Sequence, residues 1–290
     1  MTGTNAESPF SGLYDRAAEN LLEVPVSDEW IDTPDGRTHL LTAGDPSAPP
    51  VVVFQGGNIT TPVTLSWVEA LADEYYLLAP DTPGQPGKTT VETPAAYSSW
   101  VGDLLDGLGL DSAPMLGISH GAGIVLEAAA DIPDRIETAL LIVPAGFGTP
   151  LSVDLLRIVL PSLAYRLSGQ RWLLDRALTP MFTQPISAVD ETVVETVGTA
   201  LRTGDLRAEF PGPDEPAELA GFEAPTLVIT AEQDPFFPGE RTCERAGRYL
   251  SAMTACLMLT GERHFLPSVG QGHAVERIRR FLGEHGGSAR

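Results

Sequence analysis

Short apolar runs alternate with amphipathic segments through the first half of the chain. The apolar runs are VVVFQGG (51–57), YYLLAPDTPG (75–84), APMLGIS (113–119) and ETALLIVPAG (137–146). The segments that follow the first three runs carry apolar residues at helical spacing, and they are PVTLSWVEALADE (62–74), YSSWVGDLLDGLG (97–109) and HGAGIVLEAAADIP (120–133). Unbroken apolar strands that alternate with amphipathic helices predict a parallel sheet covered by helices on both faces.

Further elements are predicted before the first of these runs. SDEWIDTPDGRTHLLTAG (27–44) is typical of two strands around an Asp35-Gly36 turn, which predicts a β-hairpin. LYDRAAENLLEVP (13–25) predicts a short helix, and we expect disorder over the first dozen residues.

The alternation stops over residues 147–222, where several helical patterns occur without a strong strand. It resumes with the strand-like runs PTLVITAEQD (225–234) and TACLMLTGERH (254–264), each followed by a helical pattern. We therefore predict one α/β core that is interrupted by a helical insertion and then completed, with a mostly parallel sheet of about eight strands. The predicted parts are an N-terminal extension (1–22), the core (23–146 and 223–290) and a helical cap, or lid (147–222).

Acidic residues outnumber basic ones by a wide margin. The 290 residues include 39 Asp and Glu against 18 Lys and Arg, which gives a net charge of −21, and Lys88 is the one lysine. Such a surface repels a phosphate backbone, so nucleic acid is not an expected partner. A genome that favours Arg over Lys and adaptation to high salt both explain the acidity, and we favour the halophilic explanation.

The sequence predicts neither export nor membrane insertion. The first residues, MTGTNAESPFSG, contain no basic segment followed by an apolar one, and no apolar run approaches the roughly 20 residues of a spanning helix. With only two cysteines, Cys243 and Cys256, we predict free thiols in a reducing cytoplasm and no disulfide. The protein is therefore expected to be cytoplasmic, without a membrane partner.

The sequence GISHG (117–121) places a serine between two glycines and matches G-x-S-x-G. Ser119 falls where the predicted strand APMLGI (113–118) meets a helix that begins at His120, which is the strand–turn–helix setting that the motif requires. In that setting the glycines let neighbouring backbone pass closely, and the hydroxyl is presented above the carboxyl edge of the sheet. Ser119 is the candidate nucleophile, and a plain glycine-rich turn is the alternative.

From about residue 25 to residue 284 the chain resembles the α/β-hydrolase superfamily, and within it the lid-bearing esterase-like branch related to bacterial carboxylesterases. The resemblance implies a serine, an acid and a histidine in that chain order. Asp234, after the run LVITAEQ, resembles the acid of the family, and Glu232 is the competing carboxylate. His264, after LMLTGER, resembles the terminal histidine, whereas His273 begins the last predicted helix and is expected to be a surface residue.

The resemblance also implies two backbone amides that stabilise an oxyanion. One amide is that of His120, and the other lies in a stretch that usually begins His-Gly in the family. Here the stretch reads Gln55-Gly56-Gly57-Asn58, which assigns the second amide to Gly57. Because Gln55 replaces the customary histidine, the hydrogen bonds behind this loop stay open, and a flexible Gly-Gly loop is the alternative.

The stretch TPGQPGKTT (82–90) ends like a phosphate-binding P-loop. However, Thr82 stands where that pattern needs glycine, and Pro83 and Pro86 lack the amides that would hold phosphate. We therefore predict no nucleotide site there. No cluster of His, Cys and Asp has metal-ligand spacing, so neither a metal nor a cofactor is expected.

A serine in this turn favours acyl transfer, so we predict a serine hydrolase that cleaves an ester, lactone or thioester through an acyl-enzyme. The expected partner is a small, largely apolar, ester-like molecule, and a homodimer is left open. Two alternatives remain: another serine-triad reaction, such as carbon–carbon bond hydrolysis or perhydrolysis, and a low-turnover ligand-binding receptor or scaffold. The residues expected to line the pocket are Asn58, Phe147, Trp172, Phe182, Phe236 and Phe265, with Met181 and Phe237 as further apolar candidates.

Overall fold

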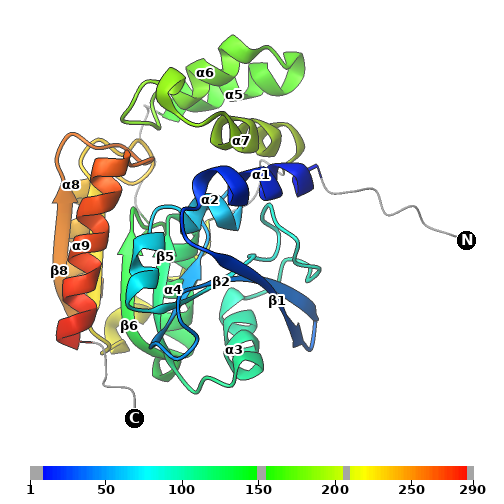
Figure 1. The fold of residues 1–290 in the computed structure, drawn as a ribbon. Helices are drawn as coiled ribbons and strands as arrows, with labels where there is room; N and C mark the ends of the chain where they lie inside the picture. Colours follow the sequence, from blue (N-terminus) through cyan, green and yellow to red (C-terminus); the bar gives the residue numbers. More distant parts are fainter. Residues whose placement is uncertain (1–8, 149–154, 205–209, 286–290) are drawn as a thin grey trace, which may run out of the picture.

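The computed structural model describes residues 9–148, 155–204 and 210–285, and within these ranges one eight-stranded sheet forms the centre of the molecule (Figure 1). The strands are β1 (Val26–Thr33), β2 (Gly36–Ala43), β3 (Pro50–Phe54), β4 (Tyr76–Pro80), β5 (Ala113–Ile118), β6 (Ile136–Ile142), β7 (Thr226–Ala231) and β8 (Met253–Leu259). Their order across the sheet is β1-β2-β4-β3-β5-β6-β7-β8. The pairs β1–β2 and β2–β4 are antiparallel and the five other pairs are parallel, which confirms the predicted mostly parallel sheet.

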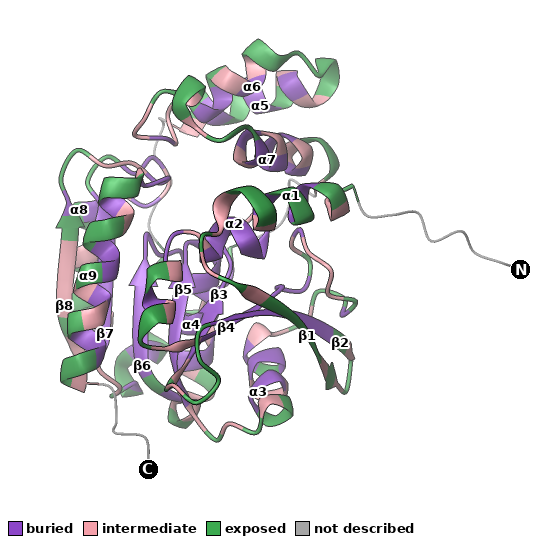
Figure 2. Cartoon of the chain, viewed as in Figure 1, coloured by how far each residue is buried: buried purple, intermediate pink, exposed green. Residues whose placement is uncertain are grey.

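Helices cover both faces of this sheet. Those outside the β6–β7 connection are α1 (Ser11–Leu21), α2 (Thr61–Leu65), α3 (Tyr97–Leu108), α4 (His120–Asp131), α8 (Gly239–Tyr249) and α9 (Ser268–His285). Buried side chains of α3, α4 and α8 form one apolar core, and those of α1, α2 and α9 form the other. The central strands are buried between these two cores (Figure 2), which explains why they appear in the sequence as unbroken apolar runs.

The antiparallel edge of the sheet is the predicted hairpin. Strands β1 and β2 pair along their whole length, from Val26 opposite Ala43 to Thr33 opposite Gly36. The turn residues are Pro34 and Asp35, one position before the predicted Asp35-Gly36 turn, and Gly36 is the first residue of β2. The hairpin extends the parallel strands through the β2–β4 pairing.

The N-terminal segment contributes to the core. Helix α1 packs against α2 and against a helix of the β6–β7 connection, and its Tyr14 and Ala17 are buried. The helix expected from the pattern of residues 13–25 is thus present, although it ends at Leu21 because Leu22 is extended. The segment 1–22, expected as an extension, is therefore in part a packed helix, and the disorder expected before it falls largely on residues 1–8, which lie outside the described ranges.

The chain leaves the sheet between β6 and β7. There it forms α5 (Leu156–Ser168), α6 (Arg171–Leu178) and α7 (Glu191–Thr203), which we call the helical layer. The three helices lie together at one end of the molecule (Figure 1), and their buried residues join the core formed by α1, α2 and α9. Residues 149–154 and 205–209 of the predicted cap lie outside the described ranges.

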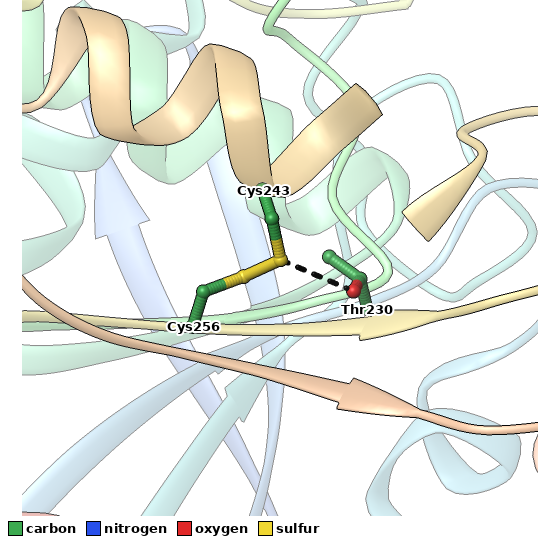
Figure 3. Close-up of a disulfide and its surroundings, with 3 residues drawn as sticks. All are labelled: Thr230, Cys243 and Cys256. Carbon is green, nitrogen blue, oxygen red and sulfur yellow. Dashed lines mark hydrogen bonds between the residues drawn. A yellow bond between two sulfur atoms is a disulfide. The ribbon is translucent and has the colours of Figure 1, made fainter. Parts of the chain in front are cut away.

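The prediction of free thiols is wrong. Cys243 on α8 and Cys256 on β8 form a disulfide with their Cα atoms 6.0 Å apart, and the Thr230 hydroxyl on β7 lies 3.5 Å from the Cys243 sulfur (Figure 3). The reason is spatial: α8 packs on β7 and β8, which brings two cysteines 13 residues apart within bridging distance. A closed loop of this length stabilises a fold by roughly 3 kcal/mol. The expectation of a cytoplasmic location loses the support that free thiols gave it.

The described ranges hold neither a helix that could span a membrane nor a cluster of metal-binding side chains. None of the helices there combines the length and the apolar character needed to cross a bilayer. No group of three or more His, Cys, Asp or Glu side chains in the same ranges is arranged to hold a metal ion.

Candidate active site

Ser119 occupies the sharp turn between β5 and α4. Its backbone has φ 52° and ψ −109°, a conformation that residues with a side chain rarely adopt. The Ser119 N–H donates to the Ile142 carbonyl at 2.9 Å, and the Ser119 carbonyl accepts from the Ala145 N–H at 3.2 Å. These bonds to the end of β6 hold the strained residue in place.

The glycines on either side of Ser119 are required by the close approach of backbone. A Cβ atom on Gly117 would lie 2.4 Å from the Ala122 nitrogen, and one on Gly121 would lie 2.2 Å from the Phe54 carbonyl oxygen. Both distances are shorter than non-bonded atoms tolerate, so the strand, the turn and the helix fit together only with glycine at these positions.

Ser119, His264 and Asp234 form a continuous hydrogen-bonded series. His264 Nε2 lies 2.9 Å from Ser119 Oγ, and His264 Nδ1 lies 2.7 Å from Asp234 Oδ2. Asp234 Oδ1 accepts the N–H groups of Phe236 and Phe237 at 2.8 Å and 3.0 Å, so the fully buried carboxylate is well satisfied. A carboxylate that accepts from Nδ1–H leaves the Nε2 lone pair facing the serine hydroxyl.

The competing residues lie elsewhere. Glu232 is exposed, and its Oε2 accepts the Gly261 N–H at 2.7 Å in the turn after β8. His273 is exposed on α9. The structure therefore brings together the residues that the sequence favoured, Ser119, Asp234 and His264, and leaves their alternatives outside.

The residues that carry the two predicted amides, Gly57 and His120, lie against each other, and Gly57 lines the same cavity as Ser119. His120 is the first residue of α4, and a leading helical amide has no partner within its helix. Gly57 lies directly against it, because a Cβ on Gly57 would be 3.2 Å from His120 Cβ. In the part of the chain that the structure describes, no hydrogen bond occupies either amide, so both are available to a ligand oxygen.

Gln55, which stands where the family usually has histidine, makes the hydrogen bonds behind the loop after β3. Its side chain is fully buried, and its Nε2 donates to the carbonyls of Ile59 at 2.8 Å and Pro86 at 3.1 Å. Its Oε1 accepts from the Thr82 N–H at 2.6 Å and the Thr61 hydroxyl at 3.0 Å. An uncharged amide thus ties the loop after β3 to the loop after β4.

Two buried side chains beside the site, His120 and Tyr97, have shifted pKa values. Burial of the His120 ring lowers its pKa to about 4, so the imidazole is neutral at ordinary pH. The ring lies edge-on to Tyr97, with centroids 5.6 Å apart. Burial and the charge of Glu127 raise the pKa of Tyr97 to about 12, so the phenol also remains uncharged.

An apolar cavity of about 350 Å³ lies over Ser119 and His264, bounded by the helical layer. Of the predicted pocket residues, Asn58, Phe236, Phe265, Met181 and Phe237 line it. The lining residues that the sequence did not single out for the pocket are Gly56, Ile59, Trp67, Ile118, Ile158, Val159, Ser162, Leu163, Val197, Leu201 and Phe210. No Asp, Glu, Lys or Arg is among these described lining residues, so the cavity suits an uncharged, apolar group.

Three predicted pocket residues do not line the cavity. Trp172 is 60% exposed on α6, where its indole N–H donates to Gln170. Phe147 is buried in the core of α3, α4 and α8, and Phe182 stacks behind Phe265 with ring centroids 4.2 Å apart. The structure places these three side chains away from the cavity, because an aromatic residue near an insertion packs on the face that the tertiary fold offers, and the sequence does not reveal that face.

Comparisons with known proteins agree with this architecture. Residues 52–278 match the alpha/beta hydrolase family, and the chain belongs to it. It is 24% identical over 289 residues to carboxylesterase YbfK of Bacillus subtilis (strain 168), covering 94% of each chain. It is also 24% identical to the uncharacterized carboxylesterase nap of the same organism, covering 93% of this chain and 91% of the relative.

The fold is also shared with solved structures. The crystal structure of naproxen esterase (carboxylesterase NP) from Bacillus subtilis superposes with a TM-score of 0.81 at 21% identity, over 94% of this chain and 96% of that one. The predicted α/β-hydrolase fold is therefore confirmed.

Proposed function

We propose that the protein is a serine hydrolase that cleaves carboxylic esters of small, largely apolar substrates through an acyl-enzyme. One observation carries the proposal: the series Asp234–His264–Ser119 is complete, and its hydroxyl end opens into an uncharged cavity. The likeness of the whole chain to two proteins named carboxylesterase supports the ester as the bond that is cleaved.

The first half of the reaction follows from the hydrogen-bonded series. Ser119 Oγ attacks the ester carbonyl carbon while His264 Nε2 accepts the hydroxyl proton, which the 2.9 Å contact between these atoms allows. Asp234 holds the ring and stabilises the imidazolium that forms. When the tetrahedral intermediate collapses, the bond to the alkoxy oxygen breaks, and His264 returns the proton to the departing alcohol.

The two free amides donate hydrogen bonds to the carbonyl oxygen as negative charge develops on it. The N–H groups of Gly57 and His120 are fixed before the substrate arrives, so they stabilise the oxyanion without reorganisation. In the second half of the reaction His264 takes a proton from water, and the hydroxide attacks the acyl carbon. When this second intermediate collapses, the bond between the acyl carbon and Ser119 Oγ breaks, and His264 returns the proton to Ser119 Oγ as the acid leaves.

The cavity lining favours esters over the alternatives. Cleavage of a carbon–carbon bond in a dienoate requires a site for the substrate carboxylate, and no Lys or Arg is among the described lining residues. Outside the reacting series, the described lining residues with a polar side-chain group are Asn58, Trp67 and Ser162, and Ser162 Oγ already donates to the Ile158 carbonyl. We therefore assign the apolar walls to an uncharged acyl or alcohol group.

We further propose that the helical layer acts as the cap of this site. Ile158, Val197 and Leu201 of α5 and α7 face the cavity above Ser119, so these helices exclude water from the acyl group. The length of substrate that the enzyme accepts is then set by the helical layer, and the chemistry is set by the sheet edge.

A panel of p-nitrophenyl esters of increasing acyl length tests the proposed function. The wild-type protein is expected to hydrolyse the panel, and His264→Ala is expected to lower kcat by about 10⁴-fold or more. His273→Ala is the matched control, since it removes an exposed histidine of the same chain and should leave kcat unchanged. Equal activity of wild type and His264→Ala, or inactivation by His273→Ala alone, would overturn the proposal.

A further inference from the structure

One side chain in the loop after β4 contacts both walls of the proposed oxyanion hole. Gln85 Oε1 accepts the Asn58 N–H at 2.9 Å, and Gln85 Nε2 lies 3.2 Å from His120 Nε2. Asn58 directly follows Gly57, and the backbone amide of His120 is the second donor of the hole. Gln85 thus connects the loop that carries one donor to the residue that carries the other.

The orientation of the Gln85 amide follows from its partners. The Asn58 N–H can only donate, so the carbonyl oxygen of Gln85 faces it and the NH₂ group faces His120. His120 Nε2 must then accept, which places the ring proton on Nδ1, a buried atom without a hydrogen-bond partner among the described residues. This arrangement needs a neutral ring, and burial keeps His120 neutral.

The loop that Gln85 holds contains a left-handed residue. Asn58 has φ 62°, a conformation that asparagine adopts more readily than most other residues with a side chain. Gly57 packs directly on the His120 side chain, so that a Cβ atom added to Gly57 would lie 3.2 Å from His120 Cβ. Any relaxation of Asn58 would therefore move the Gly57 amide relative to the His120 amide.

Gln85 is itself fixed on both sides. Tyr97 donates its hydroxyl to the Pro83 carbonyl at 3.1 Å, and its ring lies edge-on to His120. On the other side, Gln55 donates to the Pro86 carbonyl at 3.1 Å. The loop therefore presents the Gln85 amide from a position set by two neighbouring elements.

We propose that Gln85 is a positioning residue that sets the spacing of the Gly57 and His120 amides for the oxyanion. The proposal rests on the proposed function, because it assumes that these amides receive the carbonyl oxygen. Gln85 does not line the cavity and touches no reacting atom. Its loss should therefore weaken stabilisation of the transition state and leave the binding of the substrate unchanged.

Gln85→Leu tests this by removing both hydrogen bonds at nearly constant side-chain size. We expect kcat for a p-nitrophenyl ester to fall by about 10- to 100-fold with KM within about twofold of wild type. The affinity for a trifluoromethyl ketone, which forms a tetrahedral adduct in the oxyanion hole, should fall by a similar factor. The affinity for an alcohol of the same size should not change. A uniform loss of both affinities, or an unchanged kcat, would overturn the proposal.

Gln85→Glu provides a second test that does not depend on whether the leucine variant folds. The carboxylate still accepts from Asn58, but it can only accept from His120, so the ring proton must move to Nε2 or a second proton must bind. The ¹⁵N spectrum of the His120 imidazole should show Nδ1–H in wild type and an Nε2–H in Gln85→Glu, with a loss of kcat. An unchanged spectrum would contradict the hydrogen bond on which the proposal stands.

Gln170→Leu is the matched control, because Gln170 bonds to Trp172 outside the cavity. It should leave kcat and both inhibitor affinities unchanged.

The outcomes also distinguish failure of the proposed function from failure of the role proposed for Gln85. If wild type has no esterase activity that depends on Ser119, the proposed function fails. If that activity is present and Gln85→Leu and Gln85→Glu both match wild type, only the role of Gln85 fails.

Discussion

The floor and the roof of the cavity are built in different ways. In the floor, formed by the end of β5, Ser119 and the start of α4, backbone approaches backbone so closely that Gly117 and Gly121 have no space for a methyl group. In the roof, formed by the helical layer, side chains such as Val197 and Leu201 meet the cavity on one face of α7. The floor is thus fixed by main-chain geometry, and the roof is fixed by side-chain packing.

This difference separates catalysis from selectivity. A strained turn such as that of Ser119 persists only because the surrounding structure over-determines it, so changes in the floor should damage the chemistry or the fold. Apolar packing tolerates substitution better when the volume is roughly kept. Changes in the roof should therefore alter which substrates are accepted more than how fast the bond is cleaved.

The largest effect is expected from the acid that supports the floor. Asp234→Asn should lower kcat by about 10⁴-fold, because an amide that faces Nδ1 favours the wrong imidazole tautomer. Glu232→Gln is the matched control two residues earlier, and it should leave kcat within about twofold of wild type. Steady-state kinetics on a p-nitrophenyl ester measures both. A larger loss from Glu232→Gln would assign the acid to the wrong residue.

The floor should also tolerate very little extra volume. Gly121→Ala would place a methyl group against the Phe54 carbonyl, so we expect the free energy of unfolding to fall by about 3 kcal/mol or more. The matched control is Gly221→Ala, where no atom lies within 4 Å of the added methyl group and the change should stay within about 0.5 kcal/mol. Urea denaturation compares the two variants. Equal stabilities would contradict the close contact.

The buried ring of His120 should make the stability of the fold depend on pH. Its pKa is about 4 in the folded protein and about 6.5 when unfolded, so below pH 6.5 the unfolded chain binds a proton that the folded chain does not. This contribution is complete above pH 6.5 and is lost as the pH falls towards 4, by up to about 3 kcal/mol. His120→Gln should therefore show a smaller loss of unfolding free energy than wild type between pH 7 and pH 4.5. Parallel curves would show that the ring is not buried in neutral form.

The smallest effects are expected in the roof. Val197→Ala enlarges the cavity, so the ratio of kcat/KM for long acyl chains to that for short ones should change by about 10-fold. One or two methylene groups in an apolar pocket change kcat/KM by about this factor. Trp172→Ala removes a larger side chain of the same helical layer that is exposed, and its acyl-length profile should match wild type. A shift caused by Trp172→Ala and not by Val197→Ala would reverse the assignment of the cavity face.

The two regions also differ in what the sequence could predict. The candidate residues Ser119, Asp234 and His264 each follow a strand that forms an apolar run. Parallel strands bring their carboxyl ends to one edge of the sheet, so the positions of these three residues could be predicted from the sequence. The roles of Trp172 and Phe182 were not, because an amphipathic helix reveals an apolar face without revealing what covers it. The Cys243–Cys256 disulfide likewise depends on α8 packing beside β8, which the spacing of the cysteines does not encode.

The role proposed for Gln85 could not be predicted from the sequence either. Its segment could be recognised as a poor P-loop, and the two prolines around Gln85 excluded phosphate. The contacts of Gln85 with Asn58 and His120 join two loops and the start of α4, which are distant in sequence and meet only at the edge of the folded sheet. The spacing of apolar residues in a sequence indicates whether a segment is a helix or a strand. Contacts such as those of Gln85 depend on where the ends of several such segments meet in the folded protein.

The proposed mechanism requires Ser119 to be the nucleophile that forms the acyl-enzyme. Intact-mass analysis after reaction with a fluorophosphonate, followed by peptide mapping, measures this. We predict one adduct per chain on the peptide that contains Ser119, with no adduct on Ser119→Ala and a much slower reaction of His264→Ala. An unlabelled wild-type protein that still hydrolyses esters, or an adduct on another residue that persists in Ser119→Ala, would contradict the account.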